Sequence, residues 1–234
     1  MKRSLLTLAA LAVMGAPMTS LAQDAPAVAT NLSLTSKYKY RGQDQSDAEE
    51  AVLPAVQGGF DYANGGLYVG NWNSSVGFLG GTEMDFYAGY RGELSGLSYD
   101  LGALYYYYPG AVSEANTTEL YLSVGYGPAS VKLSTVVSSK YFGVVGGRGT
   151  NYIEANWKQE VAAGIYLVGH VGQTLFSSEA KDNGGINYAD YKIGADFDLG
   201  SGFTAGLGYV GATKKGQIGD INKSRLVFSI SKAL

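Results

Sequence analysis

Residues 31–41, NLSLTSKYKYR, alternate between two kinds of side chain along their whole length. Leu32, Leu34, Tyr38 and Tyr40 fall on one side, and polar or basic residues fall on the other. Successive side chains of a β-strand point to opposite faces, so this period of two predicts a strand with one apolar and one charged face. The same period recurs along the chain and decides the fold class.

The alternation predicts about twelve strands. Most have the length of about 9–11 residues that a tilted transmembrane strand needs. The connections between them are alternately long and polar, then short and turn-like, which is typical of outer-membrane barrels. We therefore predict an all-β fold, a transmembrane antiparallel up-and-down β-barrel with long extracellular loops and short periplasmic turns. The expected strands are 30–41, 51–62, 66–73, 82–91, 97–108, 116–127, 129–140, 150–159, 164–176, 187–199, 202–213 and 224–234.

The N-terminus carries the pattern of a secretory signal. Lys2 and Arg3 precede an apolar stretch at 5–16, and Ser-Leu-Ala at 20–22 offers a cleavage site. We predict a signal peptide over 1–22, a short periplasmic segment over 23–30 and the barrel over 31–234. An uncleaved anchor is the alternative, although the apolar stretch is short for a membrane span. Export places the mature protein in the cell outer membrane.

One face of most predicted strands has no charge, whereas the other face carries both signs. A soluble, lipocalin-type barrel would have to bury this charged face in a dry interior, at a high cost in free energy. A membrane barrel instead turns it toward a wet lumen, so we favour that orientation. The expected lumen-lining residues are Lys37, Lys39, Arg41, Glu83, Asp85, Arg91, Asp100, Glu119, Lys132, Lys192, Asp196 and Arg225.

Four consecutive tyrosines end the strand predicted at 97–108, within GALYYYYPGA at 102–111. Alternation sends Tyr105 and Tyr107 to the lipid side, where amphipathic rings favour the membrane–water boundary. Tyr106 and Tyr108 are expected at the mouth of the lumen. The predicted lipid-facing girdle comprises Tyr38, Tyr40, Tyr90, Tyr105, Tyr107, Tyr126, Trp157 and Tyr209.

Lys37, Lys39 and Arg41 form the densest run of basic side chains on the charged face. If they climb one strand in a row, they can guide anionic or hydroxylated solutes through the lumen. Alternatively they pair with lumen carboxylates and only stabilise the barrel. The charges expected in the lumen are balanced in sign, so they predict no ion selectivity.

Longer stretches resemble a known family. The chain resembles the Gcw_chp family of bacterial proteins, also called the TorF porin family, in LTSKYKYRGQDQS, PAVQGGFDYANGGLYVGNW, MDFYAGYRGEL, SYDLGALYYYYPG, NTTELYLSVGYG, LGYVGAT and RLVFSISK. The resemblance extends from residue 32 to the C-terminus. It implies an outer-membrane barrel of porin type and carries over no binding residue.

The sequence offers little for catalysis or for metal binding. The single histidine, His170, lies mid-strand and far from Ser177 and Ser178, so no catalytic triad is expected. We expect no enzyme activity, cofactor or metal. The acidic stretch DQSDAEE at 44–50 lacks the spacing of a calcium loop. It is either a solvated loop or a site where divalent cations bridge to lipopolysaccharide.

These observations predict a porin that admits small polar solutes by passive diffusion through a narrow charged lumen. The alternative is a plugged structural or interaction barrel whose extracellular loops bind a partner or lipopolysaccharide. The expected partners are outer-membrane lipid, lipopolysaccharide and, during insertion, the barrel-assembly machinery. A formal net charge of −3 argues against a nucleic-acid partner. The sequence does not define an oligomeric state.

Overall fold

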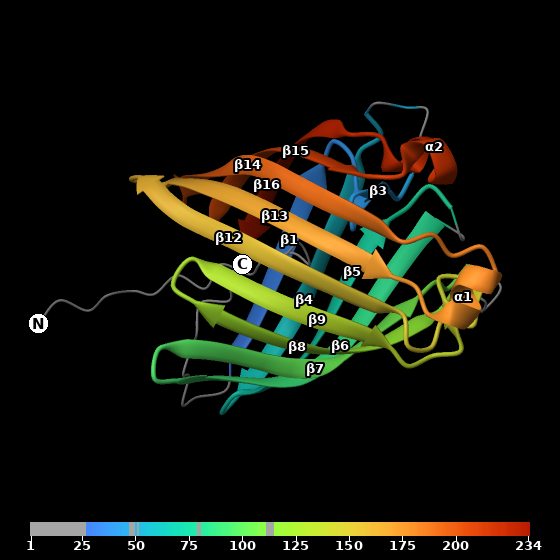
Figure 1. Ribbon diagram of the computed structural model, residues 1–234. Coiled ribbons are helices and arrows are strands. Elements are labelled where there is room, and N and C mark those ends of the chain that lie inside the picture. Colours follow the sequence, from blue (N-terminus) through green and yellow to red (C-terminus); the bar gives the residue numbers. More distant parts are fainter. Residues whose placement is uncertain (1–26, 47–49, 51, 79–80, 111–114) are drawn as a thin grey trace, which may run out of the picture.

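A closed antiparallel barrel forms the body of the protein (Figure 1). The computed structural model describes residues 27–46, 50, 52–78, 81–110 and 115–234. In these residues twelve long strands make up the barrel: β1 (Ala27–Thr35), β4 (Ala55–Asn64), β5 (Leu67–Ser75), β6 (Thr82–Leu94), β7 (Leu97–Tyr107), β8 (Thr117–Tyr126), β9 (Ala129–Val136), β12 (Asn151–Ala162), β13 (Ile165–Leu175), β14 (Tyr188–Gly200), β15 (Phe203–Ala212) and β16 (Arg225–Ala233).

The first and last strands close the barrel. β1 pairs with β4 on one side and with β16 on the other, and the second register runs from Asn31 opposite Ala233 to Thr35 opposite Ser229. Closure pairs the backbone groups that an open sheet would leave exposed at its edges. The predicted antiparallel up-and-down barrel is therefore confirmed.

The two ends of the barrel differ. At one end, here called the short-turn end, tight turns join the strands, as at Gly65 and Gly66, which have φ values of 57° and 89°. Positive φ at both central residues suits the twist of a two-residue hairpin and favours glycine. The other end, the long-loop end, lies to the right in Figure 1. It carries the short elements β2 (Lys39–Tyr40), β3 (Gln43–Asp44), β10 (Lys140–Tyr141), β11 (Val144–Val145), α1 (Ser178–Asp182), α2 (Lys215–Ile218) and a 3-10 turn (Asp220–Asn222).

The outer surface of the barrel is apolar and the inner surface is polar. On β8, Leu120 and Leu122 are each 52% exposed on the outer face, whereas Glu119 on the inner face is 1% exposed. This is the reverse of a water-soluble barrel and the expected arrangement for one surrounded by lipid. In the described part of the chain, no helix has the length and apolar character needed to cross a membrane.

Most of the tyrosines assigned to the girdle point outward. Tyr90, Tyr105, Tyr126, Trp157 and Tyr209 are exposed on the outer surface. Tyr107 is half-buried and stacks on Tyr105, with ring centroids 6.1 Å apart. Their contact with lipid stays a prediction.

The first strand corrects the prediction for 30–41. β1 begins at Ala27, four residues before the expected start of the barrel, and ends at Thr35. The chain then leaves the wall and enters the barrel, so Tyr38 and Tyr40 lie inside, and their assignment to the lipid-facing girdle is wrong. The predicted signal peptide lies outside the described residues.

Inside the wall, several tyrosine rings lie over glycines of the neighbouring strand. Tyr121 of β8 covers Gly102 of β7, and a Cβ atom at Gly102 would be 2.6 Å from the Tyr121 hydroxyl oxygen. Tyr68 covers Gly89 in the same way. These glycines provide the space in which the rings lie flat against the wall.

Replacing Gly102 with Val is expected to destabilise the barrel by about 1–3 kcal/mol, because the added side chain overpacks against Tyr121. The urea concentration at which the folded form is lost, read from heat-modifiable migration on SDS gels, measures this. Gly169→Val is the matched control, since a Cβ atom at Gly169 meets nothing within 4 Å. Equal midpoints for Gly102→Val and the wild type would contradict the packing argument.

Candidate functional site: the barrel interior

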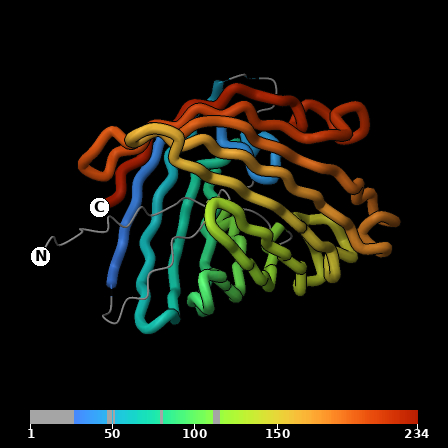
Figure 2. The backbone as a smooth tube through the Cα atoms, turned by 60° about the vertical axis from the view of Figure 1, so that its left-hand side comes forward, coloured from blue at the N-terminus to red at the C-terminus, as the bar shows by residue number. Residues whose placement is uncertain are grey.

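Residues 36–46, called the inward hairpin below, cross the interior at the long-loop end (Figure 2). Within it β2 pairs with β3, with Lys39 opposite Asp44 and Tyr40 opposite Gln43. The chain reverses at Arg41 and Gly42. The hairpin therefore stands between the barrel walls as a separate element.

Gly42, at the tip of the hairpin, touches the inner wall at β15 and β14, two and three strands away from β1 around the barrel. Its φ is 74°, and a Cβ atom there would be 2.5 Å from the backbone oxygen of Gly211 on β15. The same atom would be 2.6 Å from Cβ of Asp190 on β14. Only glycine satisfies both the backbone angle and the contact. The tip of the hairpin is therefore packed against β14 and β15.

Tyr38 fixes the hairpin to β5 and β6. Its hydroxyl donates to Oε1 of Glu83 at 2.7 Å, and its ring packs edge-on against Trp72 with centroids 5.6 Å apart. The hydroxyl of Tyr108 donates to the other oxygen of Glu83. Two tyrosines therefore hold one buried carboxylate, which would be costly to bury alone.

Arg41 fixes the hairpin to the opposite part of the wall. Its Nη1 and Nη2 atoms each lie 2.8 Å from one oxygen of Glu119 on β8, and Nη1 also donates to the Tyr141 hydroxyl at 2.8 Å. The Arg41 Cζ atom lies 4.0 Å from the ring centroid of Tyr152 on β12. Beside it, the hydroxyls of Tyr40 and Tyr106 are 2.6 Å apart. A two-pronged bond of this kind is among the strongest polar contacts in proteins.

Lys39 and Asp44 fix the hairpin to the 3-10 turn Asp220–Asn222 and to β16. The Lys39 ammonium lies 3.0 Å from Oδ1 of Asp44, and it donates to the backbone oxygen of Ile221 at 3.4 Å. Burial lowers the pKa of Lys39, and the nearby Asp44 charge opposes that shift. Arg225 of β16 lies 3.5 Å from the other Asp44 oxygen. Asp44 is only 3% exposed, so the prediction of a solvated acidic loop is wrong at this residue.

Glu50 ends the acidic stretch. Glu50 is exposed, and its backbone oxygen accepts a hydrogen bond from the Lys37 ammonium at 2.8 Å. Asp47 and Glu49 lie outside the described residues. Among the described residues, no group of three His, Cys, Asp or Glu side chains is arranged to hold a metal ion.

The predicted basic ladder is therefore wrong. Lys37, Lys39 and Arg41 do not climb a strand, because β1 ends at Thr35. They are buried, and Lys39 and Arg41 pair with carboxylates, as in the alternative interpretation of the sequence. The alternation of residues 31–41 predicts one continuous strand because the extended segment that contains β2 keeps the period of two of β1.

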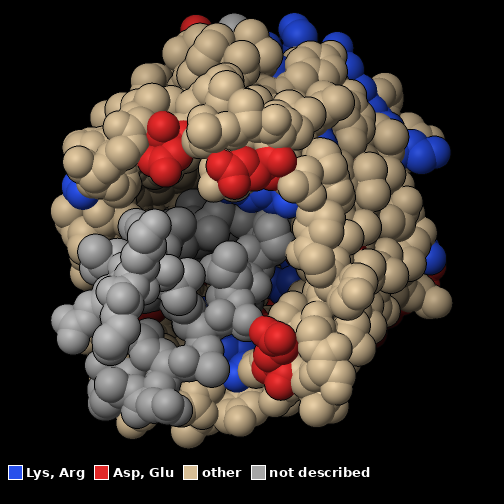
Figure 3. All heavy atoms as spheres, turned by 90° about the vertical axis from the view of Figure 1, so that its left-hand side faces the viewer, with Lys and Arg blue, Asp and Glu red and all other residues tan. Residues whose placement is uncertain are grey.

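The remaining predicted lumen-lining residues lie on barrel strands and on their inner face. Arg91 lies over the Tyr68 ring at 5.1 Å, and Lys132 lies over the Tyr121 ring at 4.4 Å. Within the described ranges, neither Arg91 nor Lys132 has a carboxylate at ion-pair distance. The other members are Glu83, Asp85, Asp100, Glu119, Lys192, Asp196 and Arg225. Seen from the short-turn end, the barrel is hollowed, with basic side chains visible inside it and carboxylates at its rim (Figure 3).

Three inner carboxylates are held by tyrosines that the sequence analysis did not assign, namely Tyr68, Tyr87 and Tyr152. Tyr68 donates to Asp100 at 2.6 Å, and Tyr87 donates to Asp61 at 2.8 Å. The signal was available in the sequence, since Tyr87 follows Asp85 by two positions and therefore shares its face. Burial of these tyrosines excludes them from the girdle and makes them part of the lumen wall.

Tyr106 and Tyr108 lie inside the long-loop end, as the alternation predicts. Each is 2% exposed. The Tyr106 hydroxyl donates to Glu119 at 3.3 Å, so both tyrosines contact carboxylates that also bind the inward hairpin. They act as supports for the hairpin within the mouth.

His170 faces the interior among polar groups. Its Nε2 atom lies 2.8 Å from Asp190 and its Nδ1 atom 2.6 Å from the side-chain oxygen of Asn156. Ser177 instead caps α1, where its hydroxyl accepts from the backbone N–H of Ala180 at 3.0 Å. Among the described residues, the hydrogen-bond partners of His170 are Tyr152, Asn156 and Asp190, and none of them is a serine.

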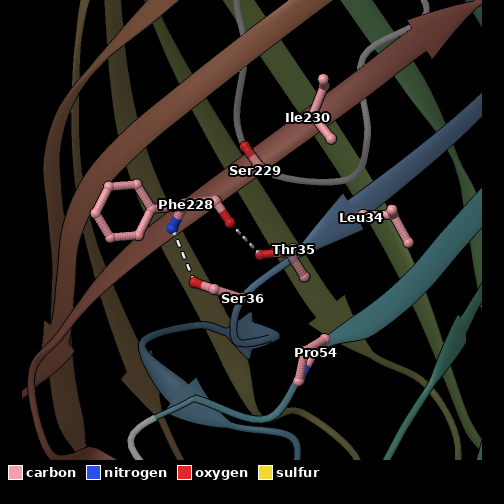
Figure 4. Close-up of a pocket in the computed structure, with 7 residues that line it drawn as sticks. All are labelled: Leu34, Thr35, Ser36, Pro54, Phe228, Ser229 and Ile230. Carbon is pink, nitrogen blue, oxygen red and sulfur yellow. Dashed lines mark hydrogen bonds between the residues drawn. The ribbon is translucent and has the colours of Figure 1, made fainter.

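A hollow on the outer wall marks the point where the hairpin leaves β1 (Figure 4). Its volume is about 350 Å³, and its lining residues are Leu34, Thr35, Ser36, Pro54, Phe228, Ser229 and Ile230. The Ser36 hydroxyl accepts from the backbone N–H of Phe228 at 2.9 Å, and the Thr35 hydroxyl donates to the Phe228 carbonyl at 3.3 Å. These side chains replace strand hydrogen bonds where the backbone turns inward.

Comparison with known proteins decides the family. The model of a family described as "Bacterial protein of unknown function (Gcw_chp)" matches residues 21–234. The chain belongs to the Gcw_chp family. No curated protein sequence matches this Gcw_chp chain.

Solved structures share the fold of this Gcw_chp chain. It is similar to the KdgM porin, with a TM-score of 0.55 and 7% identity over 88% of this chain and 97% of that one. It is also similar to the NanC porin, with a TM-score of 0.52 and 9% identity over 88% and 98% of the two chains. At such low identity, the likeness shows that the Gcw_chp chain has a porin-like barrel fold.

Glu119→Gln is expected to release the inward hairpin, because Arg41 would remain buried without its charge partner, at a cost of about 3–5 kcal/mol. Release exposes the peptide bonds after Lys37, Lys39 and Arg41 to trypsin, so the cleavage rate in detergent micelles measures it. Asp196→Asn is the control, since Asp196 pairs with Lys158 and does not contact the hairpin. Equal trypsin resistance of Glu119→Gln and the wild type would show that the Arg41–Glu119 pair does not hold the hairpin.

Proposed function

We propose that this protein is an outer-membrane channel that admits small polar solutes by passive diffusion, and that the inward hairpin sets the width of its extracellular mouth. In this orientation the long-loop end faces outward and the short-turn end faces the periplasm. The signal-like N-terminus predicted from the sequence agrees with export. Outer-membrane lipid surrounds the apolar wall, and lipopolysaccharide lies near the long loops.

The observation that best supports a channel is the contrast between the two halves of the barrel interior. The long-loop half is crossed by the hairpin, whose contacts reach β6, β8, β14, β15 and β16. The short-turn half is hollowed and lined with charged and hydroxyl side chains (Figure 3). Such a lining can replace the hydration of a polar solute. A barrel of twelve strands lies between filled barrels of about eight strands and open porins of about 16–18 strands.

The structural neighbours support a channel in general terms. The KdgM porin, to which this chain is similar, is also known in complex with disordered oligogalacturonate, with a TM-score of 0.50 and 8% identity to this chain. At this identity the likeness concerns the fold. By this likeness to porins, we propose that the chain is a non-enzymatic channel without a cofactor.

The second candidate function is a plugged barrel with a structural or binding role. The observation in its favour is the hairpin itself, which is held by buried contacts on several sides. Extracellular loops would then bind a partner or lipopolysaccharide, with no passage of solute.

Current through planar bilayers separates the two functions. The wild type is expected to show small, discrete conductance steps. Replacing residues 38–45 with a short Gly-Ser linker should raise the conductance severalfold, because it removes the element that crosses the mouth. Liposome swelling with sugars and amino acids gives the corresponding measurement for neutral solutes.

Lys215→Ala is the matched control, because Lys215 lies at the same end of the barrel and its side chain is exposed. It should leave the conductance of the wild type unchanged. A linker variant that migrates as a folded barrel and yet passes no current would contradict the channel and favour the structural role.

A further inference from the structure

Arg41 occupies a site with the features of a guanidinium receptor. Two parallel hydrogen bonds of 2.8 Å join it to the Glu119 carboxylate, and a third of 2.8 Å joins it to the Tyr141 hydroxyl. The Tyr152 ring covers its face at 4.0 Å from Cζ to the ring centroid. We name Glu119, Tyr141 and Tyr152 the guanidinium cage.

The cage discriminates by shape as well as by charge. A guanidinium group is planar and presents paired N–H groups that fit a carboxylate, and its face stacks on aromatic rings. An ammonium group lacks both properties. Lys39 illustrates the difference within the same hairpin, since its ammonium lies among Asp44 and backbone oxygens instead.

The cage residues are held by contacts that do not involve Arg41. The Tyr152 hydroxyl donates to both oxygens of Asp190 at 3.1 Å, and Glu119 accepts from Tyr106 at 3.3 Å. The Tyr141 ring packs edge-on against Phe176, with centroids 5.4 Å apart. A site whose walls are fixed in advance binds its ligand with less loss of entropy.

The cage and its occupant come from different elements. Glu119 and Tyr152 lie on the barrel strands β8 and β12 and Tyr141 on the loop strand β10, whereas Arg41 lies at the turn between β2 and β3. The three cage residues are each at most 5% exposed, and all three contact Arg41 of the hairpin. Removal of the Arg41 side chain would leave a vacancy of guanidinium shape beside the barrel interior.

We propose that the guanidinium cage is a binding site for guanidinium-bearing cations, and that Arg41 is its built-in occupant. An arginine-like solute that enters the barrel competes with Arg41 for the same carboxylate, hydroxyl and ring. This inference goes beyond the proposed function and depends on it only for the route by which a solute reaches the cage.

Chemical rescue of Arg41→Ala tests the site, with methylguanidinium as the probe. The variant is expected to lose trypsin protection at Lys37 and Lys39, and methylguanidinium should restore it in a saturable manner. Methylammonium should be weaker by about tenfold or more, since it loses at least one charge-assisted hydrogen bond. The double variant Arg41→Ala with Glu119→Gln should show no rescue.

Equal effects of the two cations, or rescue that persists in the double variant, would overturn the proposal. If Arg41→Ala does not fold, its refolding yield in the two cations makes the same comparison, and an equal yield would overturn it as well. Because these assays measure protection and folding, a negative result leaves the channel proposal to the bilayer recordings.

Discussion

The barrel buries carboxylates on its inner wall, and a buried carboxylate is stabilised by a donor or a cation placed beside it. Burying one unpaired charge in a protein interior costs on the order of several kcal/mol of folding free energy. Glu119 receives Arg41, and Glu83 receives the hydroxyls of Tyr38 and Tyr108. The position of the inward hairpin follows from this requirement, because it delivers donors to carboxylates that lie on different strands. The same requirement explains why so many tyrosines face inward.

Much of the fold follows from local rules. The period of two predicts twelve strands and the approximate place of each, because each strand separates an apolar outer face from a polar inner face, but it extends the first strand beyond its end at Thr35. The turn residues Gly65 and Gly66 mark a hairpin by their backbone freedom. Closure of β1 on β16 follows from an even number of antiparallel strands, since an open edge would leave backbone groups without partners.

The alternation of apolar and polar residues could not predict the inward hairpin, and the reason is physical. Lys37 to Arg41 continue the period of β1, so a strand that stays in the wall and one that leaves it have the same pattern. The difference lies in long-range partners such as Glu119, which is 78 positions away in the sequence. Tyr38 and Tyr40 were misassigned for the same reason, because an amphipathic ring suits a membrane boundary and a polar interior equally well. The local sign of the departure is the Arg41-Gly42 pair, whose left-handed backbone cannot continue a strand.

The tyrosine rings that lie over glycines have a consequence for the free cross-section of the passage. A ring that projected toward the axis would occupy the centre of a barrel of this size, whereas a ring that lies flat adds only its thickness to the wall. Gly89 and Gly102 therefore determine the inner diameter of the barrel as well as the packing of its wall. Exchanging glycine for larger residues at such positions would give related barrels different inner diameters with the same number of strands.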